Sequence, residues 1–235
     1  MKLFGFEIEK RTIIFLLIFS VVGLFLYQIK FSEILGVQSQ NFTLFQFIGP
    51  IGAGIAGSAF GVVSVLIVES MNFLVNGKAP ELLTFVRFLP MMLAALYFGQ
   101  KGKSSAVIAA ICMVAFWASP VGLQVWYYPL YWLIPIGASF FKGNIFVRSL
   151  GATFTAHAVG SVIFLYAFAI PAPVWASLIP IVAIERLTFA GGITASYYAM
   201  NTILDALSSK ARIDLGFLNI DKKYSLIAAP APKQE

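Results

Sequence analysis

Apolar residues occur in long runs along this chain, and only short polar stretches separate the runs. The apolar runs cover residues 12–27, 42–75, 82–98, 104–118, a short stretch ending at 141, 149–170 and 174–207. A helix needs about 20 mostly apolar residues to cross a bilayer. The pattern therefore predicts an all-α, polytopic transmembrane helical bundle of six or seven spans, formed by residues 1–208. A polar tail of residues 209–235, disordered at its tip, is expected to follow.

Some of these runs leave the local structure open. Residues 42–75 are too many for one upright helix and too few for two helices with a loop. Either a tilted helix follows a short leading segment, or the chain breaks around Gly49 and Pro50. Residues 126–132 hold five aromatic side chains and are expected at the membrane–water boundary, where such rings collect. Residues 142–148 are expected to form a polar loop.

The composition supports a membrane protein. Of the 235 residues, 60% are hydrophobic and 11% are charged, and the mean hydropathy is +0.88. Soluble domains carry about 25% charged residues, so this chain cannot cover a water-facing surface of ordinary polarity. A soluble enzyme, a disordered chain, a nucleic-acid binder and a large extramembrane domain are excluded. We expect a multi-pass protein of the cell membrane, whose main surroundings are the lipid bilayer.

The net charge of +6 comes from basic residues near the ends of the apolar runs, a distribution that sets membrane topology. Basic residues of the tail place the C-terminus in the cytoplasm, namely Lys210, Arg212, Lys222 and Lys223. Counting back puts Lys101 and Lys142 on the same side and the N-terminus outside. The basic residues at positions 2, 10 and 11 favour a cytoplasmic N-terminus instead. The sequence thus leaves the parity of the spans open.

Small residues are frequent in the second run. Gly52, Gly54 and Gly57 spell G-x-G-x-x-G, but this dinucleotide fingerprint works only between a strand and a helix of a soluble βαβ unit. Small residues at every fourth position instead predict a flat helix face against which another helix packs closely. This predicted face comprises Gly49, Ala53, Gly57 and Gly61.

Ionisable residues inside the runs are the candidate functional groups, because a charge in the bilayer is costly unless it has a partner or a role. Glu69 follows the small-residue face and is expected to point into the bundle. Arg87 lies near the start of its run and either extends to the interface or faces the interior. His157 is the only histidine, and is either a packing residue, a ligand contact or a proton-sensing group.

Glu185 and Arg186 form the strongest functional signal. They lie in the last run between Pro180 and the pair Gly191–Gly192, which is expected to interrupt the helix. Adjacent residues on a helix point about 100° apart, so each charge is expected to find its partner on another helix. The candidate substrate-binding residues are Glu69, Arg87, His157, Glu185 and Arg186.

Motifs for chemistry are missing from the sequence. It contains no H-E-x-x-H zinc helix, no G-x-S-x-G elbow with a matching acid and histidine, no Walker A sequence and no selectivity-filter repeat. The sequence therefore predicts no catalytic residue, no metal and no cofactor. Cys112 is the only cysteine, so an intrachain disulfide cannot form.

The Gly-Pro-rich tract IGPIGAGIAGSAFGVV, residues 48–63 of a small polytopic chain, resembles the substrate-binding S subunits of energy-coupling factor transporters. The resemblance implies six spans, a cytoplasmic C-terminus, capture of a small polar solute, and ATPase and coupling subunits as partners. The cationic groups near the expected site favour an anionic or zwitterionic solute. Two other classes stay open: a membrane enzyme acting on lipid or peptide through Cys112, Arg148 and His157, and a structural subunit of a membrane complex.

Overall fold

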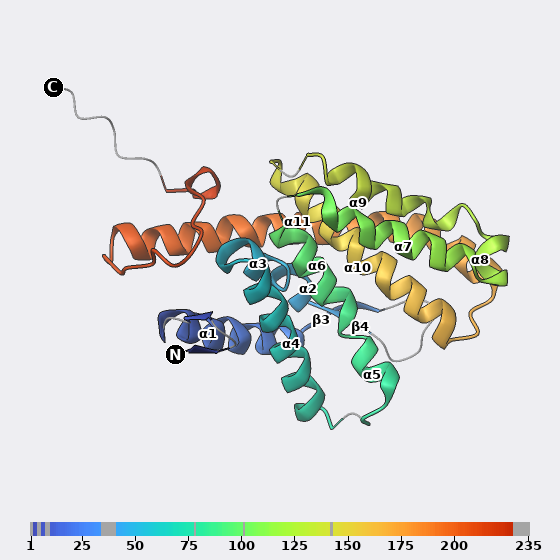
Figure 1. The fold of residues 1–235 in the computed structure, drawn as a ribbon, viewed down its shortest axis with the longest axis horizontal. Coiled ribbons are helices and arrows are strands. Elements are labelled where there is room, and N and C mark those ends of the chain that lie inside the picture. Colours follow the sequence, from blue (N-terminus) through green and yellow to red (C-terminus); the bar gives the residue numbers. More distant parts are fainter. Residues whose placement is uncertain are drawn as a thin grey trace.

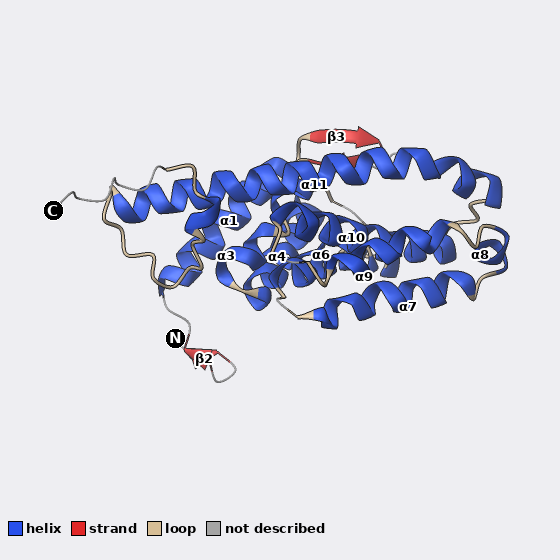
Figure 2. Ribbon diagram, turned by 90° about the horizontal axis from the view of Figure 1, so that it is seen from above, coloured by secondary structure: helices blue, strands red, loops and turns tan. Residues whose placement is uncertain are grey.

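The protein is described here by a computed structural model that covers residues 2–3, 6–7, 10–33, 41–77, 79–100, 102–141 and 143–227. Lys101 and Lys142, used above for the expected topology, lie outside the described residues, as does the tip of the tail from residue 228. The described part is an all-α bundle with two short antiparallel strand pairs at its periphery (Figures 1 and 2).

The helices follow one another along the chain, and the segment 28–44, which contains β3 and β4, separates α1 from α2. They are α1 (Lys10–Tyr27), α2 (Phe45–Ile48), α3 (Ile51–Ala56), α4 (Ser58–Val75), α5 (Leu82–Val86), α6 (Leu89–Gly99), α7 (Ala106–Trp117), α8 (Pro120–Gln124), α9 (Leu133–Ala138), α10 (Ile145–Ala167) and α11 (Ala172–Ser209). Single 3-10 turns are η1 (Lys103–Ser105), η2 (Tyr128–Trp132) and η3 (Lys222–Tyr224). The strand pairs are β1 (Lys2–Leu3) with β2 (Phe6–Glu7), and β3 (Lys30–Glu33) with β4 (Asn41–Thr43).

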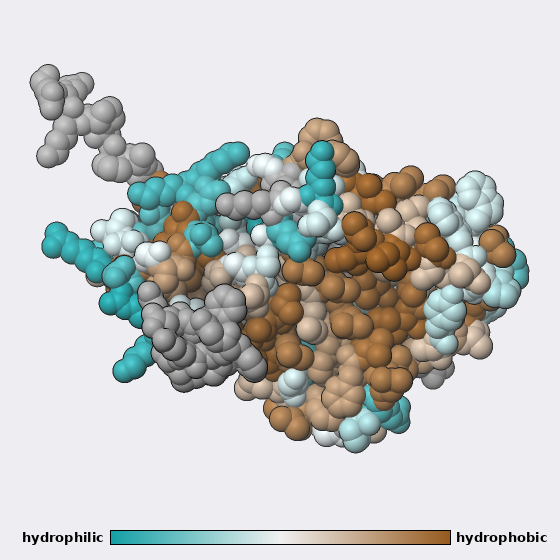
Figure 3. All heavy atoms as spheres, in the orientation of Figure 1, coloured by the Kyte–Doolittle hydropathy of each residue, from teal (hydrophilic) through white to brown (hydrophobic). Residues whose placement is uncertain are grey.

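Several helices are suited to a bilayer. By length and composition, five described helical segments can cross a membrane: Lys10–Tyr27, Ser58–Val75, Leu82–Gly99, Ile145–Ala167 and Ala172–Ser209. Two shorter apolar segments add to them, Phe45–Ala56 and Lys103–Trp117. Hydrophobic side chains cover much of the visible face, and hydrophilic ones gather at the end where the start of α1 and the segment after α11 lie (Figures 1 and 3). The protein is an integral membrane protein.

The second apolar run is broken at Gly57, and not around Gly49 and Pro50, where one of the two alternatives places the break. Gly49 and Pro50 keep right-handed helical backbone angles between α2 and α3, whereas Gly57 has a φ of +94°, in the region that favours glycine. Helices α3 and α4 then fold back on each other, so closely that a Cβ on Gly61 would lie 2.3 Å from the Cβ of Ala53. The prediction of one continuous small-residue face is therefore wrong, because Ala53 and Gly61 lie on two helices that face each other across a hairpin.

The predicted interruption of the last helix is wrong. Helix α11 runs without a break through 38 residues, including Pro180 and the Gly191–Gly192 pair (Figure 2). Gly192 allows another helix to pack closely against α11 and does not interrupt it. The ring of Phe47 on α2 lies against it, and a Cβ there would come within 2.4 Å of the ring carbon Cδ1. A Cβ on Gly191 would meet no described atom within 4 Å.

Two other expectations are corrected near α10. The loop expected at 142–148 is shorter, because the Asn144 side chain accepts hydrogen bonds from the first amides of α10 and starts the helix at residue 145. The aromatic segment 126–132 is only partly at the surface. Its first two rings are exposed, whereas Tyr128 and Trp132 are 1% and 0% exposed. They belong to the core because they pack against α7, α10 and α11.

The core forms two apolar clusters. One gathers α1 to α4, α6 and the second half of α11, and the other gathers α7 to α10 with the first half of α11. Helix α10 approaches α6 closely, since a Cβ on Gly151 would lie 2.3 Å from the Tyr97 hydroxyl oxygen. That hydroxyl is buried and donates to the carbonyl of Pro135, at 2.7 Å. Residues of both clusters line the cavity described below.

The start of α1 and the segment after α11 lie at one end of the molecule (Figure 1). Arg11 and Asp214 form an ion pair there. The pKa of Asp214 lies below its ordinary value, because its carboxylate accepts a hydrogen bond from the Gly216 amide and pairs with Arg11. The polar segment after α11 returns to the bundle, where the Asn219 amide donates to the carbonyl of Ile55 at 2.7 Å.

Candidate functional site

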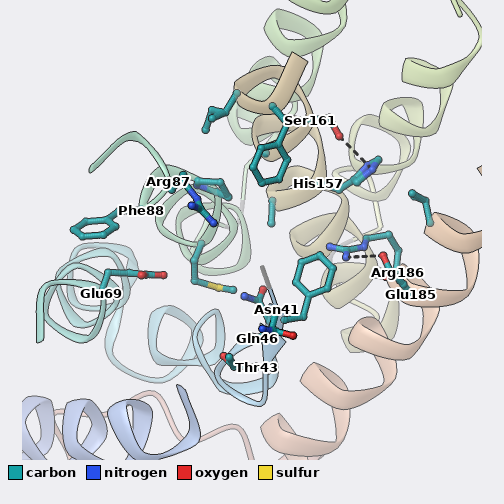
Figure 4. A pocket seen from close by; sticks show the side chains of 18 of the residues that line it. Asn41, Thr43, Gln46, Glu69, Arg87, Phe88, His157, Ser161, Glu185 and Arg186 are labelled. Carbon is teal, nitrogen blue, oxygen red and sulfur yellow. Dashed lines mark hydrogen bonds and ion pairs between the residues drawn. The ribbon is translucent and has the colours of Figure 1, made fainter. Parts of the chain in front are cut away.

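A cavity of about 680 Å³ opens between the ends of several helices. Its walls come from the end of α1, from β3 and β4, and from α2, α4, α5, α6, η2, α10 and α11. All five candidate binding residues line this cavity, although they come from distant parts of the chain (Figure 4). They are Glu69, Arg87, His157, Glu185 and Arg186. Pockets of this volume are typical of small-molecule sites.

Glu69 lies on one wall, on α4. Its side chain is 6% exposed, and the hydroxyl of Tyr27 donates to Oε2 at 2.9 Å. Asn72 and Asn76 follow on the same face of α4, as the helical spacing of three and four residues requires. Gln28 donates to the Asn72 side-chain oxygen at 3.2 Å. Glu69 therefore points into the bundle, as expected, within a wall of polar side chains.

Arg87 lies at the turn between α5 and α6. The helix is interrupted there, between Val86 and Leu89. The Arg87 guanidinium lies 5.8 Å from the centre of the Phe164 ring on α10, within the range of a cation–π contact. The residue is half-buried and lines the cavity (Figure 4). Of the two positions that the sequence allows, the structure has the inward one.

His157 is held at both ring nitrogens. Trp132 Nε1 lies 3.1 Å from Nδ1, while the hydroxyls of Tyr128 and Ser161 lie 3.0 and 3.3 Å from Nε2. An indole N–H can only donate, so Nδ1 is an acceptor and carries no proton. The imidazole is then neutral with its proton on Nε2. Because Nε2–H donates to one of the two hydroxyls, the Tyr128 hydroxyl can direct its own proton elsewhere.

Glu185 and Arg186 form an ion pair with each other, which corrects the expectation that neighbours on a helix do not pair. Arg186 Nη2 lies 3.4 Å from Glu185 Oε2, because the long arginine side chain bends back over the preceding turn. The Arg186 guanidinium also lies 4.8 and 4.5 Å from the ring centres of Phe42 and Phe189. Its Nη1 donates to the Thr153 hydroxyl at 3.4 Å.

Sequence reasoning missed part of the site. Tyr128 and Trp175 line the cavity, but their positions suggested a membrane-boundary role or none. Lys30 on β3, Asn41 on β4 and Gln46 on α2 also line it. Lys30 and Asn41 lie among other polar residues, so nothing in the sequence marked them, whereas the polarity of Gln46 between apolar residues was an available signal. Only their proximity in the folded chain links them to Glu69 and Arg186.

The residues considered for an enzyme do not come together. Cys112 is buried in the apolar cluster around Phe116 and does not line the cavity. Arg148 stacks 4.1 Å from the ring centre of Phe98 and is likewise absent from the cavity wall. Within the described residues, no group of three histidine, cysteine or acidic side chains is arranged to hold a metal ion.

The lining has a mixed charge. Three cationic side chains, Lys30, Arg87 and Arg186, face two carboxylates, Glu69 and Glu185, among the described residues. With His157 neutral, the wall carries one positive charge in excess. Such an arrangement can orient a polar or charged solute through hydrogen bonds and ion pairs. Comparison of this chain with protein-family models, with curated proteins and with solved structures gives no match.

Proposed function

We propose that this membrane protein binds a small polar solute in the cavity and serves as the solute-binding subunit of a transporter. One observation carries the proposal: the ionisable residues that the bilayer makes costly converge on a single cavity from α4, the α5–α6 turn, α10 and α11. Glu185 and Arg186 pair with each other, yet the ionisable side chains together still line about 680 Å³ of space that a solute can occupy.

The placement of the cavity supports uptake from one side of the membrane. Helix α1 begins beside Asp214 and ends beside the cavity, while α11 begins at the cavity and ends beside α1's first turn. The cavity thus lies toward the end opposite the two termini. With the C-terminus in the cytoplasm, as its basic residues favour, the solute would enter from outside, and the chain would cross the membrane an even number of times.

The proposal includes partners for energy. The sequence has no Walker A motif, so ATP-driven movement requires a separate ATPase, and a coupling subunit would connect it to this chain. The experiment is purification in mild detergent, with mass spectrometry of both the protein and the small-molecule fractions. One stoichiometric small molecule, or co-purifying ATPase and coupling subunits, is the expected result. A lone protein with neither would refute the proposal.

A matched pair of variants tests whether a retained molecule binds in the cavity. Gly160 on α10 lines the cavity with space beside it, since the nearest atom to an added Cβ is Pro90 Cγ at 3.9 Å. Gly160→Leu therefore fills part of the cavity. Gly137→Leu adds the same side chain to an exposed position of α9, where a Cβ meets no described atom within 4 Å. The molecule should be lost from the first variant and kept by the second.

A further inference from the structure

Two buried hydrogen-bond donors on the cavity wall have no acceptor among the described residues. They are Nε of Arg186 and Nε1 of Trp175, and both side chains are 2% exposed. Burying such a donor without an acceptor is unfavourable by about 1–3 kcal/mol. Both residues line the same cavity, so a molecule inside it can supply the missing acceptors.

The two donors lie on the same face of one helix. Trp175 and Arg186 are eleven residues apart on α11, which is about three turns, so their side chains leave the helix in nearly the same direction. Both can only donate. The Tyr128 ring packs against Trp175, and its hydroxyl lies 3.0 Å from His157 Nε2 on α10. Because Trp132 donates to Nδ1 of His157, the proton of that imidazole is on Nε2, and the Tyr128 hydroxyl can donate its own proton to a ligand. This wall therefore requires a ligand that carries acceptors.

The surroundings of the Arg186 guanidinium favour the binding of an anion. Phe42 and Phe189 hold it from their ring faces, which fixes its orientation without using its N–H groups. Its contacts to Glu185 and Thr153 are both 3.4 Å, longer than usual for a charged pair. A planar carboxylate can accept two parallel hydrogen bonds from such a fork.

The charge of the wall sets the charge of the ligand. The described lining residues carry one positive charge in excess, with three cations against two carboxylates and a neutral His157. A single negative charge balances this wall, whereas a phosphate monoester carries nearly two at neutral pH. The second unpaired donor, on Trp175, accommodates a neutral acceptor away from that charge.

We propose that the cavity binds an organic monoanion, whose carboxylate is held by Arg186 and whose second, uncharged acceptor is held by Trp175. This inference rests on the proposed function and adds the chemical class of the solute. Tyr128, whose ring packs against Trp175, and Phe42, whose ring lies against the Arg186 guanidinium, line the cavity and provide contact for an apolar body between the two acceptors.

The inference is tested by calorimetric titration of the purified protein in detergent with four small probes. The probes are 4-acetylbenzoate, its neutral amide 4-acetylbenzamide, the cation 4-acetylbenzylammonium, and phenyl phosphate. We expect the carboxylate to bind at least tenfold more tightly than the other three. Arg186→Gln should weaken carboxylate binding at least tenfold, and Arg148→Gln, at a half-buried arginine outside the cavity, should leave it unchanged.

The variant Trp175→Phe tests the second acceptor, because it removes the N–H and keeps an aromatic ring. It should weaken 4-acetylbenzoate several-fold and leave plain benzoate unaffected. If Arg186→Gln does not fold, two measurements still test the inference: the affinities of the four probes for the parent protein, and the effect of Trp175→Phe. Equal binding of the amide and the carboxylate, or preference for the cation or phosphate, would overturn the assignment and leave solute binding intact.

The same preparation identifies any molecule that the protein retains during purification. A retained monocarboxylate supports the inference when no probe binds. A retained neutral, cationic or phosphorylated molecule overturns it, although the protein then still binds a solute. If no probe binds and the parent protein retains no molecule, the inference fails, and the proposed function fails with it when no ATPase and coupling subunits co-purify.

Discussion

The adjacent glycines of α11 allow a test of close packing in which one residue is the control for the other. A methyl group on Gly192 would overlap the Phe47 ring, with contacts of 2.4, 2.6 and 2.7 Å, whereas one on Gly191 meets no described atom within 4 Å. Replacing either glycine by alanine improves helix propensity by the same amount, about 1 kcal/mol. That gain cancels when the two variants are compared. The difference between them isolates the steric term.

The expected difference follows from the contacts. Extra volume in a packed region costs about 1–3 kcal/mol, and for a chain of this length each kcal/mol shifts the melting temperature by about 2–4 °C. Gly192→Ala should therefore melt about 2–12 °C below Gly191→Ala, as followed by far-ultraviolet circular dichroism in detergent. Phe47→Leu should remove most of this difference, because the two positions are coupled. Equal melting temperatures for the two alanine variants would refute the packing role and support a hinge at the glycine pair.

Three other predictions concern separate parts of the molecule. Tyr97→Phe removes the donor to the Pro135 carbonyl and should lower the free energy of unfolding by about 0.5–1.5 kcal/mol in the same melt; an unchanged melt would contradict it. The depressed pKa of Asp214 means that its pair with Arg11 stabilises the fold at neutral pH and is lost as pH falls below the ordinary carboxyl pKa of about 4. Spin labels at the start of α1 and after α11 should separate over that range, and in Asp214→Asn the separation should be independent of pH. Cys112, buried among apolar side chains, should resist a water-soluble alkylating reagent until a denaturing detergent unfolds the protein. Rapid labelling of the folded protein would contradict this and support an enzymatic role.

The amino-acid sequence is enough to identify a helical membrane protein and to place the charges of its long apolar runs, such as Glu69 and Arg186, in the interior. Both follow from local physics. Long apolar runs must form helices in lipid, because every backbone polar group needs an internal partner there. A charged residue in such a run turns away from lipid, so Glu69 and Arg186 were identifiable one at a time, whereas the sequence left the direction of Arg87 open. Their convergence on one cavity did not follow from the sequence.

Which side chains contact one another follows from the folded chain and could not be predicted from the sequence. Helical spacing fixes where a Cβ points, but the end of an arginine side chain can move several ångströms from that direction, which is why Glu185 and Arg186 pair. The role of each glycine also depends on its neighbour. At Gly57 the chain reverses, whereas at Gly192 the Phe47 ring occupies the space and the helix continues. Likewise, the aromatic residues of the 126–132 segment look alike in the sequence, and Tyr128 joins the cavity because α10 presents His157 to it.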